Sequence, residues 1–471
     1  MLLKKSKSKS KPRPQTPISE GPSETGMIWL HNEESVSAIP MHYYGVKGHW
    51  YFPNGGNGYS RLKEGQMMTM LAEYGLRKNK PDDQGNTPAD RAQMWLIQNR
   101  SVAYAGLLAG YVAGLHKLNG ETILVTDSPR FIEPKAGPFN TIQSLVTTLF
   151  QDPLHNQYGV FVQWLAQCYR AFRDRMTEDG PWAFQHCPIL GIFGDSGCGK
   201  SALIKLVLEP LLGGKRADPL KFLNEGKFNK DLFSASLLVL DDKAAAANLE
   251  ERRMRVGSLK ALLWDQDQRM EGKGTDALDL TVQPFWRLVI AGNPGPGYNI
   301  LPTLDKSLRD KMILLHCAQA EKLPSTNEQR AAWANKIALE LPAFAHFLTK
   351  FKASAKVDRR TGCVNFWHPM LENALMELQP EMRLLEMIDT LNLIGDDAAV
   401  WEGSASEFEQ AMRSLDKDAD GKKSGIMERM FYNGQRAGAM LSELADQTTR
   451  VKKTNPGNKS HYRIYLTEPG K

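Results

Sequence analysis

The sequence has few cysteines, no apolar run long enough to cross a membrane and little excess charge outside its first residues. Five cysteines occur among its 471 residues, an odd number with no close pair. This argues against a disulfide scaffold and against a zinc site of the usual paired-cysteine spacing, and it favours a reducing compartment. We therefore expect a cytoplasmic protein.

The longest apolar stretch, residues 102–115, has about 14 residues, whereas a helix that spans a bilayer needs about 20. Gly106, Gly110 and Gly114 recur in it at every fourth position. This spacing predicts a tightly packed core helix whose glycine face lets another backbone approach. We expect no membrane association, and the basic start is not followed by the apolar run of a secretory signal.

The excess of positive charge is concentrated at the amino terminus. Lysine and arginine number 59 against 53 aspartates and glutamates, and the first 13 residues carry six of the cations and no acid. Any nucleic acid would therefore be bound by local patches and not by bulk charge. Residues 1–26, rich in Lys, Ser and Pro, predict a disordered basic tail. Such a tail contacts DNA or RNA, serves as an address or linker, or has no specific role.

Hydrophobic periodicity organises the rest of the chain. It predicts helices at 66–74, 90–97 and 158–173 and a strand at 122–126. Apolar strands then alternate with helices from 189 to about 318, which is typical of a parallel α/β sheet. The expected parts are an α+β N-terminal domain or oligomerisation collar at 27–188, an α/β core at 189–352, a helical linker region at 353–403 and a small C-terminal domain at 404–471.

The strongest motif follows the first apolar strand of the α/β core. Residues 194–201 read GDSGCGKS, a complete G-x-x-x-x-G-K-S loop between an apolar strand and a helix. Backbone N–H groups of such a loop surround a phosphate, Lys200 neutralises phosphate charge, and the Ser201 hydroxyl binds Mg²⁺. The sequence thus predicts an ATP and Mg²⁺ site made by Gly194, Asp195, Ser196, Gly197, Cys198, Gly199, Lys200 and Ser201.

Two later apolar segments end in polar residues that suit the same site. Residues 236–240 end at Asp241 and Asp242, which we assign to the metal and to the attacking water, respectively. Residues 286–291 lead to Asn293, whose amide suits a hydrogen bond to that water and to the γ-phosphate. An ordinary strand-to-loop turn is the alternative for each.

Between these two segments the sequence predicts a helix that carries Lys260 and a hairpin with basic residues. Arg269 precedes the tip and Lys273 lies in the Glu-Gly-Lys-Gly turn itself. A cation on a hairpin tip suits contact with a phosphate backbone, although alone it would be an unremarkable surface turn.

Taken in order, these features resemble a superfamily 3 helicase, and most of all the helicase module of the primase-helicases of phages, plasmids and satellites. The resemblance covers residues 190–350 well. It implies a P-loop AAA+-like ATPase core that assembles into a ring, expected to be a hexamer, in a bacterial host or a virus-infected cell. It also implies that Lys273 grips single-stranded DNA in the central channel and that Lys260 reaches the nucleotide of the neighbouring subunit.

The chain departs from the family in two respects. The family places an arginine finger just before the strand after the sensor asparagine, but here that position holds Lys311, and Arg309 lies two residues earlier. Because a lysine cannot make the planar bidentate contact of an arginine, we assign the finger to Arg309. No acidic cluster of the priming type precedes the core, so a separate primase or polymerase is an expected partner.

The C-terminal sequence adds evidence for DNA. Residues 434–444 predict a recognition-type helix, and two β-compatible segments around an Asn-Pro-Gly-Asn turn follow it. This order is typical of a winged helix, which binds duplex DNA, although such domains also serve protein contacts alone. The candidate DNA contacts are Arg436, Lys452, Lys453, Lys459 and Arg463.

The sequence therefore predicts an ATP- and Mg²⁺-dependent ring-forming DNA helicase or translocase for the replication of a mobile genetic element, acting on single-stranded or duplex DNA. The alternative is a DNA-binding ATPase switch, such as an initiator, loader or defence sensor, that does not unwind. A small-molecule kinase is a weaker third option. The pairs His186–Cys187 and His316–Cys317 are too isolated in sequence to predict a metal site.

Overall fold

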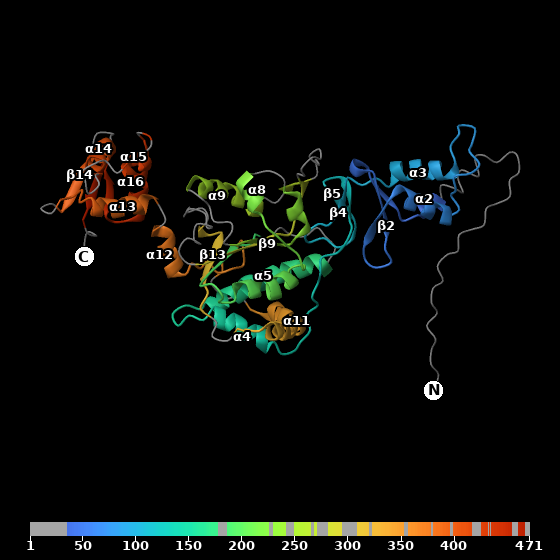
Figure 1. Ribbon diagram of the computed structural model, residues 1–471, viewed down its shortest axis with the longest axis horizontal. Helices are drawn as coiled ribbons and strands as arrows, with labels where there is room; N and C mark the ends of the chain where they lie inside the picture. Colours follow the sequence, from blue (N-terminus) through green and yellow to red (C-terminus); the bar gives the residue numbers. More distant parts are fainter. Residues whose placement is uncertain are drawn as a thin grey trace.

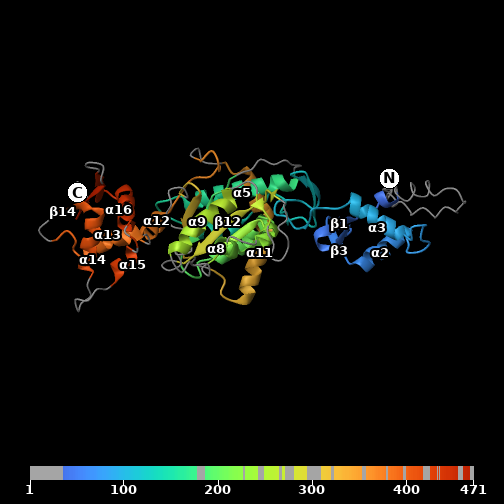
Figure 2. The ribbon, with the colours of Figure 1, turned by 90° about the horizontal axis from the view of Figure 1, so that it is seen from above.

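The computed structural model describes most of the chain, and its parts follow one another along the longest axis of the molecule (Figures 1 and 2). Among the described residues, none of the helices combines the length and the apolar character required to cross a bilayer. The described residues are 35–177, 186–225, 229–241, 249–264, 268–270, 281–293, 309–319, 323–352, 357–377, 380–395, 399–416, 425–431, 433, 435–454 and 460–466.

The N-terminal part is a small antiparallel sheet covered by two helices. The sheet has the order β1 (His42–Tyr44), β2 (His49–Pro53), β3 (Tyr59–Leu62). Helices α2 (Glu64–Glu73) and α3 (Pro88–Asn99) bury their apolar faces against it, in agreement with the helices predicted at 66–74 and 90–97. The side chain of Thr87 caps α3 in a capping box with Asp90, and Pro88 occupies the first helical position.

The helix predicted at 102–115 is wrong, because this segment forms parts of a second sheet. Its strands are β4 (Tyr104–Gly106), β5 (Gly114–Leu118) and β6 (Glu121–Val125), with β6 in the middle. Gly110 and Gly114 have φ angles of 81° and 142°, which a right-handed helix cannot contain. The strand predicted at 122–126 is confirmed as β6, joined to β5 by an Asn119–Gly120 turn with positive φ at both residues.

The central part is built on the predicted parallel sheet. Its five strands all run parallel, and β7 (Ile189–Phe193) lies between β13 (Met312–His316) and β12 (Arg287–Gly292). Beyond β12 come β9 (Leu237–Leu240) and the short β8 (Arg216–Ala217). All five residues of β7 are buried, as expected for a central parallel strand covered on both faces.

Helices cover both faces of this sheet (Figure 1). Against one face pack α4 (Asn140–Leu149), α5 (Gln157–Thr177) and α11 (Asn327–Lys350). Against the other pack α8 (Leu220–Glu225), α9 (Leu249–Trp264) and α12 (Pro369–Glu377), together with the β4–β6 sheet. Helices α4 and α5 precede residue 189, so the packed core extends back beyond the expected boundary of the α/β part.

The helix that follows β7 is irregular. It begins as α6 (Lys200–Leu203), passes through a π-helical turn at Ile204–Leu208 and ends as α7 (Glu209–Leu211). Pro210 has no N–H to donate, so the regular ladder cannot continue through it. The helix then ends at Gly213 and Gly214, both with positive φ.

The C-terminal part has its own core of three helices, one short helix and three strands. The sheet order is β14 (Val400–Ser404), β16 (His461–Tyr465), β15 (Val451–Thr454), all antiparallel. The apolar face of this sheet packs against one helix that precedes β14 and three helices that lie between β14 and β15 in the sequence. These are α13 (Pro380–Thr390), α14 (Ala405–Leu415), α15 (Ile426–Met430) and α16 (Arg436–Gln447). Because α13 and β14 belong to this core, the packed unit begins before residue 404.

The contact of Gly110 with the central core gives a test of the second sheet. A Cβ at Gly110 would lie 2.4 Å from Phe285 Cβ, at a φ that disfavours any side chain. We expect Gly110→Ala to lower the free energy of unfolding by about 3 kcal/mol, through strain and overpacking together. Gly120→Ala is the matched control, because its φ of 86° is similar but its Cβ would meet nothing within 4 Å. It should cost only about 1 kcal/mol. Equal losses in denaturant unfolding would contradict the packing argument.

Candidate functional site

The candidate site lies where four parallel strands end. Phe193 at the end of β7 pairs with Gly292 on β12, and the Gly194 N–H donates to the Gly292 carbonyl at 3.3 Å. On the other side, the Cys317 N–H donates to the Phe193 carbonyl at 2.6 Å. The chain leaves β7 toward β8 at one edge of the sheet, whereas the chain that leaves β12 crosses β7 to reach β13 at the other edge. Ligands of open α/β sheets bind outside the carboxyl ends of the strands where the connections diverge in this way.

The loop from Gly194 to Ser201 is shaped by its glycines. A Cβ on Gly194 would lie 2.3 Å from the carbonyl oxygen of Cys317, so this position has no room for a side chain. Gly197 and Gly199 have φ angles of 82° and 116°, in the left-handed region. The loop then enters α6 at Lys200, which presents the first N–H groups of a helix toward the loop. Such an arrangement suits an anion.

Lys200 is turned inward and links the loop to the neighbouring strand. Its ammonium donates to the carbonyls of Gly194 at 2.6 Å and Asp195 at 2.9 Å, and to Asn293 Oδ1 at 3.1 Å. The residue is only 8% exposed. The structure therefore brings together two residues that the sequence placed 93 positions apart, and it does so through neutral acceptors that a phosphate oxygen can replace.

Two cysteines lie near this lysine: Cys198, which was predicted as part of the loop, and Cys317, for which no role was predicted. Lys200 Nζ is 3.5 Å from Cys198 Sγ. A hydrogen bond from Cys317, opposed by burial and aided by the charge of Lys200, lowers the pKa of Cys198 to about 6. Burial and the same hydrogen bond raise the pKa of Cys317 well above its usual range. Cys198 is therefore the more acidic thiol of the two, and it lies in the loop next to the ammonium of Lys200.

The other predicted nucleotide residues lie along the same edge or outside the described part. Asp241 directly follows β9 and is exposed, and Leu240 before it pairs with Ile290 on β12. Lys260 lies on α9 and is partly exposed. Asp242 lies outside the described residues.

The base of the predicted basic hairpin is present. Gln268 pairs with Val282 and Arg269 with Thr281 in the short antiparallel strands β10 (Gln268–Arg269) and β11 (Thr281–Val282). The Asn229 side chain donates to the Arg269 carbonyl at 2.8 Å, which ties this base to the central part. The Arg269 side chain is exposed, and Lys273 lies outside the described residues.

Arg309, the residue assigned as the finger, makes its contacts within the chain. Its guanidinium lies 2.5 Å from Glu372 at the start of α12 and packs over the Trp367 ring. Lys311 lies over the ring of Trp264 on α9. The Arg309 side chain is 58% exposed, so solvent screens this ion pair from one side although Glu372 is only 18% exposed.

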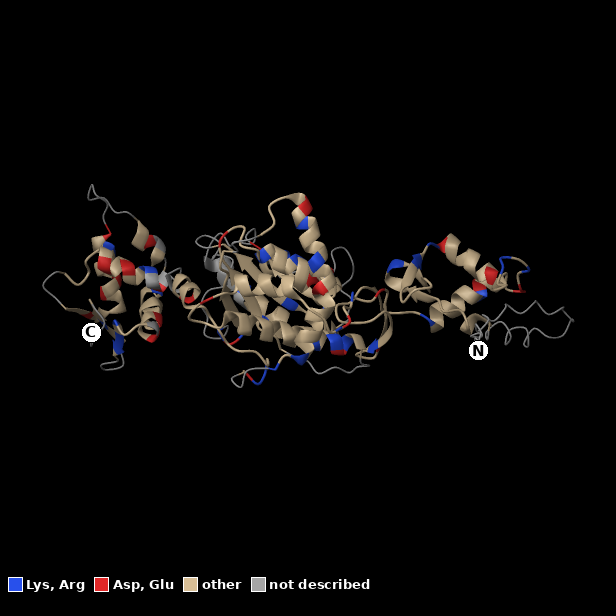
Figure 3. Ribbon diagram, turned by 90° about the horizontal axis from the view of Figure 1, so that it is seen from below, with Lys and Arg blue, Asp and Glu red and all other residues tan. Residues whose placement is uncertain are grey.

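The C-terminal cations fall into two groups. Lys452, Lys453 and Arg463 lie on β15 and β16 with exposed side chains, and acidic and basic residues are interspersed along the ribbon (Figure 3). Arg436 differs, because it is 13% exposed and pairs at 3.1 Å with Glu381, which is 3% exposed. Lys459 lies outside the described residues. The sequence could not separate these groups, since all of them are cations in a basic segment.

The contrast between two of these arginines can be measured. Arg436→Ala would leave the buried carboxylate of Glu381 without this partner, and we expect a loss of about 3 kcal/mol in the free energy of unfolding of the C-terminal part. Arg463→Ala removes an ion pair with Glu402 at 2.7 Å that is half exposed, and it should cost about 0.5 kcal/mol or less. Denaturant unfolding of the two variants checks this. A small effect for Arg436→Ala would return this residue to the set of free DNA contacts.

Comparison with known proteins adds evidence on the fold. A profile described as a family of unknown function (DUF5906) matches residues 192–307, well under half of the chain. No curated protein matches the sequence. Among solved structures, the chain is similar to the apo structure of the NrS-1 C terminal region, with 16% identity and a TM-score of 0.52 over 94% of this chain and 100% of that one.

An A form apo structure of the same NrS-1 region gives 14% identity and a TM-score of 0.50 over 93% of this chain and 98% of that one. At these identities the likeness shows the fold alone. The structure "SCCmec type IV Cch - active helicase" matches at 10% identity over 87% of this chain and 72% of that one, but its TM-score of 0.29 is too low to argue from. The chain is thus a mixed α/β protein on a five-stranded parallel sheet, with the fold of the NrS-1 C-terminal region.

Proposed function

We propose that this chain is an ATP- and Mg²⁺-dependent, ring-forming DNA helicase or translocase of the superfamily 3 type, used in the replication of a mobile genetic element. The observation that carries the proposal is the 3.1 Å contact between Lys200 Nζ and Asn293 Oδ1. It joins the phosphate-binding loop to the end of the adjacent strand, where a γ-phosphate and its attacking water would lie.

The binding step follows from what now holds Lys200. The carbonyls of Gly194 and Asp195 and the Asn293 amide oxygen keep its ammonium next to the loop. Phosphate oxygens of ATP would take over part of this coordination, and the first N–H groups of α6 would supply further hydrogen bonds. Lys200 would thus be moved only slightly between the empty and the bound site, which lowers the reorganisation cost.

The remaining catalytic roles are distributed over the neighbouring strands. The Ser201 hydroxyl and the Asp241 carboxylate are exposed oxygen ligands of the kind that Mg²⁺ prefers, and the bound ion would neutralise phosphate charge. Asp242 would orient the attacking water. Asn293 would contact the γ-phosphate once phosphate oxygens replace its amide oxygen as a partner of Lys200.

Assembly and DNA binding complete the proposal. In a ring, expected to be a hexamer, Arg309 would leave its ion pair with Glu372 to reach the nucleotide of the next subunit, and Lys260 would reach that nucleotide from α9. The Arg269–Lys273 hairpin would grip single-stranded DNA in the channel. The order α14, α15, α16, β15, β16 supports a winged helix whose wing carries Lys452, Lys453, Lys459 and Arg463.

Substitutions of Lys200 and Asn293 should affect nucleotide binding and ATP hydrolysis differently. Asn293→Ala keeps the loop, so we expect nucleotide affinity within a few-fold of wild type but ATP hydrolysis reduced by about 100-fold. Lys200→Ala should lose nucleotide binding as well. Binding of a fluorescent ATP analogue and phosphate release measure the two effects separately. Wild-type hydrolysis by Asn293→Ala would remove the sensor role.

A substitution in the predicted hairpin distinguishes a helicase from an ATPase switch that binds DNA without unwinding it. We expect single-stranded DNA to stimulate hydrolysis by the wild-type ring about tenfold or more, and Lys273→Ala to abolish stimulation and unwinding while basal hydrolysis persists. Lys336→Ala on the exposed face of α11 is the control for loss of one positive charge. DNA-stimulated hydrolysis without strand displacement would favour the switch. A monomer that ignores DNA and phosphorylates a metabolite would favour a kinase.

A further inference from the structure

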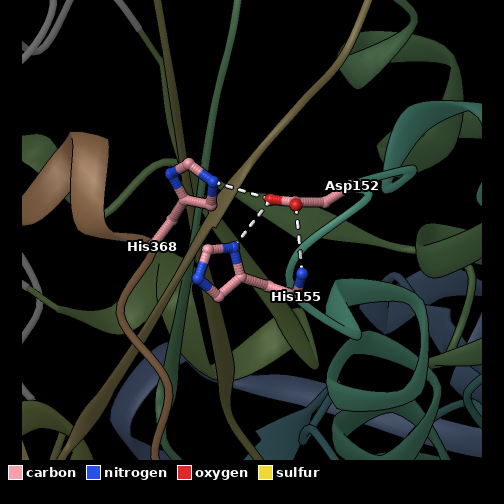
Figure 4. Close-up of side chains that lie close together, drawn as sticks. All are labelled: Asp152, His155 and His368. Carbon is pink, nitrogen blue, oxygen red and sulfur yellow. Dashed lines mark hydrogen bonds and ion pairs between the residues drawn. The ribbon is translucent and has the colours of Figure 1, made fainter.

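Two segments far apart in the sequence meet at the outer edge of the central sheet. Asp152 and His155 lie in the turn between α4 and α5, and His368 lies just before α12 (Figure 4). Asp152 Oδ2 is 3.2 Å from His155 Nδ1 and 2.8 Å from His368 Nε2. One nitrogen or oxygen atom from each residue lies within 4.8 Å of the others.

The carboxylate at the centre of this cluster is held in place. Asp152 Oδ1 accepts hydrogen bonds from the backbone N–H groups of Leu154 at 2.8 Å and His155 at 3.0 Å, which leaves Oδ2 facing the two imidazoles. Burial opposes its ionisation, but these hydrogen bonds and those from both histidines outweigh burial and hold the pKa of Asp152 well below its usual range. The two backbone hydrogen bonds therefore fix the orientation of the carboxylate, with Oδ2 toward both imidazoles.

The geometry suits a small divalent cation. Tetrahedral zinc has ligand distances of about 2.0 to 2.2 Å, which place neighbouring ligand atoms about 3.3 Å apart. The separations of 2.8 and 3.2 Å need only a small outward shift to reach this value. The side chains of Asp152 and His368 are 10% and 12% exposed and that of His155 is 31% exposed, so the cluster is closed at its base and open at one side.

Contacts with β13 hold the segment that carries His368 in place. The backbone N–H of His368 donates to the Leu314 carbonyl at 2.9 Å, and the indole N–H of Trp367 donates to the Met312 carbonyl at 2.8 Å. His368 is thus attached to the edge of β13 by its own backbone. The ring of His316, at the end of β13, lies 5.2 Å from that of His368, so a third imidazole borders the same space.

We propose that Asp152, His155 and His368 bind a divalent transition cation of the zinc class, with a water or the nearby imidazole of His316 completing its coordination. Two imidazoles and one carboxylate are a donor set that suits this class of metal better than Mg²⁺ or Ca²⁺. The cation fastens the turn before α5 to the segment that enters α12. The proposal does not depend on the function proposed for the phosphate loop.

Co²⁺ titration of the metal-stripped, tag-free full-length protein tests the site. We expect one Co²⁺ per chain, with the visible absorption band of a four-coordinate, nitrogen-ligated ion, and Zn²⁺ should displace it. Oxygen ligands such as Ser201 and Asp241 would give six-coordinate Co²⁺ with weak absorption, so the band reports on the histidine cluster.

The variants separate a cation site from a purely hydrogen-bonded cluster. His155→Asn and His368→Gln place an amide N–H near the position of each donor nitrogen, so they retain the hydrogen bonds to Asp152 but remove the ligands. We expect each to weaken Co²⁺ binding by at least about 100-fold, while the metal-free proteins unfold close to the wild-type temperature. His49→Asn in the N-terminal sheet should bind as wild type does.

Two results would overturn the proposal. One is the absence of the four-coordinate band in the wild-type protein, which would leave Asp152 as a hydrogen-bonding residue alone. The other is unchanged Co²⁺ affinity in both ligand variants. If His368→Gln does not fold, His155→Asn still decides the question, because His155 is the most exposed of the three residues.

Discussion

The close approach of β13 to β7 sets the geometry on which the candidate site depends. A Cβ at Gly191 in β7 would lie 2.5 Å from Leu314 Cδ2, and one at Gly194, just after β7, would lie 2.3 Å from the Cys317 carbonyl oxygen. Because two glycines face β13, its end lies directly against the loop, and Cys317 reaches Cys198. The amine of Lys200 is then enclosed by loop carbonyls on one side and by Asn293 of β12 on the other. The position of Lys200 thus depends on the close packing of β7 and its loop against β13.

Apolar patterns predicted those parts of the fold in which burial decides the structure. The segments around Val289 and Ile313 are mainly apolar, and they form β12 and β13 with both faces covered. The same signal misled at residues 102–115, because regular glycine spacing also arises where single glycines occupy left-handed turns. The apolar face of a helix also does not indicate which element it packs against. We therefore expected α5 in the N-terminal part, although it packs against one face of the central sheet.

Side-chain pairing was the part of the site that the sequence could not supply. Nothing local to Arg436 distinguishes it from Arg463, yet one meets a buried glutamate 55 positions away and the other a surface glutamate. His316 looked isolated because its neighbour His368 comes 52 positions later. Motifs are local in sequence, so the loop containing Lys200 was predictable, whereas charge compensation and clusters depend on long-range packing.

β13 connects the two sites that this structure suggests. Its inner side pairs with β7 and ends against the loop at 194–201, and its outer side holds residues 366–368 through backbone hydrogen bonds. The side-chain amide of Gln157, at the start of α5, clamps the His316 backbone through both its N–H and its C=O. This clamp lies between the Asp152 cluster and Cys317. A cation at the cluster would therefore restrain the outer border of β13, while the position of the loop is already set by glycine packing and by the clamp. Stability and nucleotide chemistry would accordingly respond to the metal to different degrees, although both depend on the same strand.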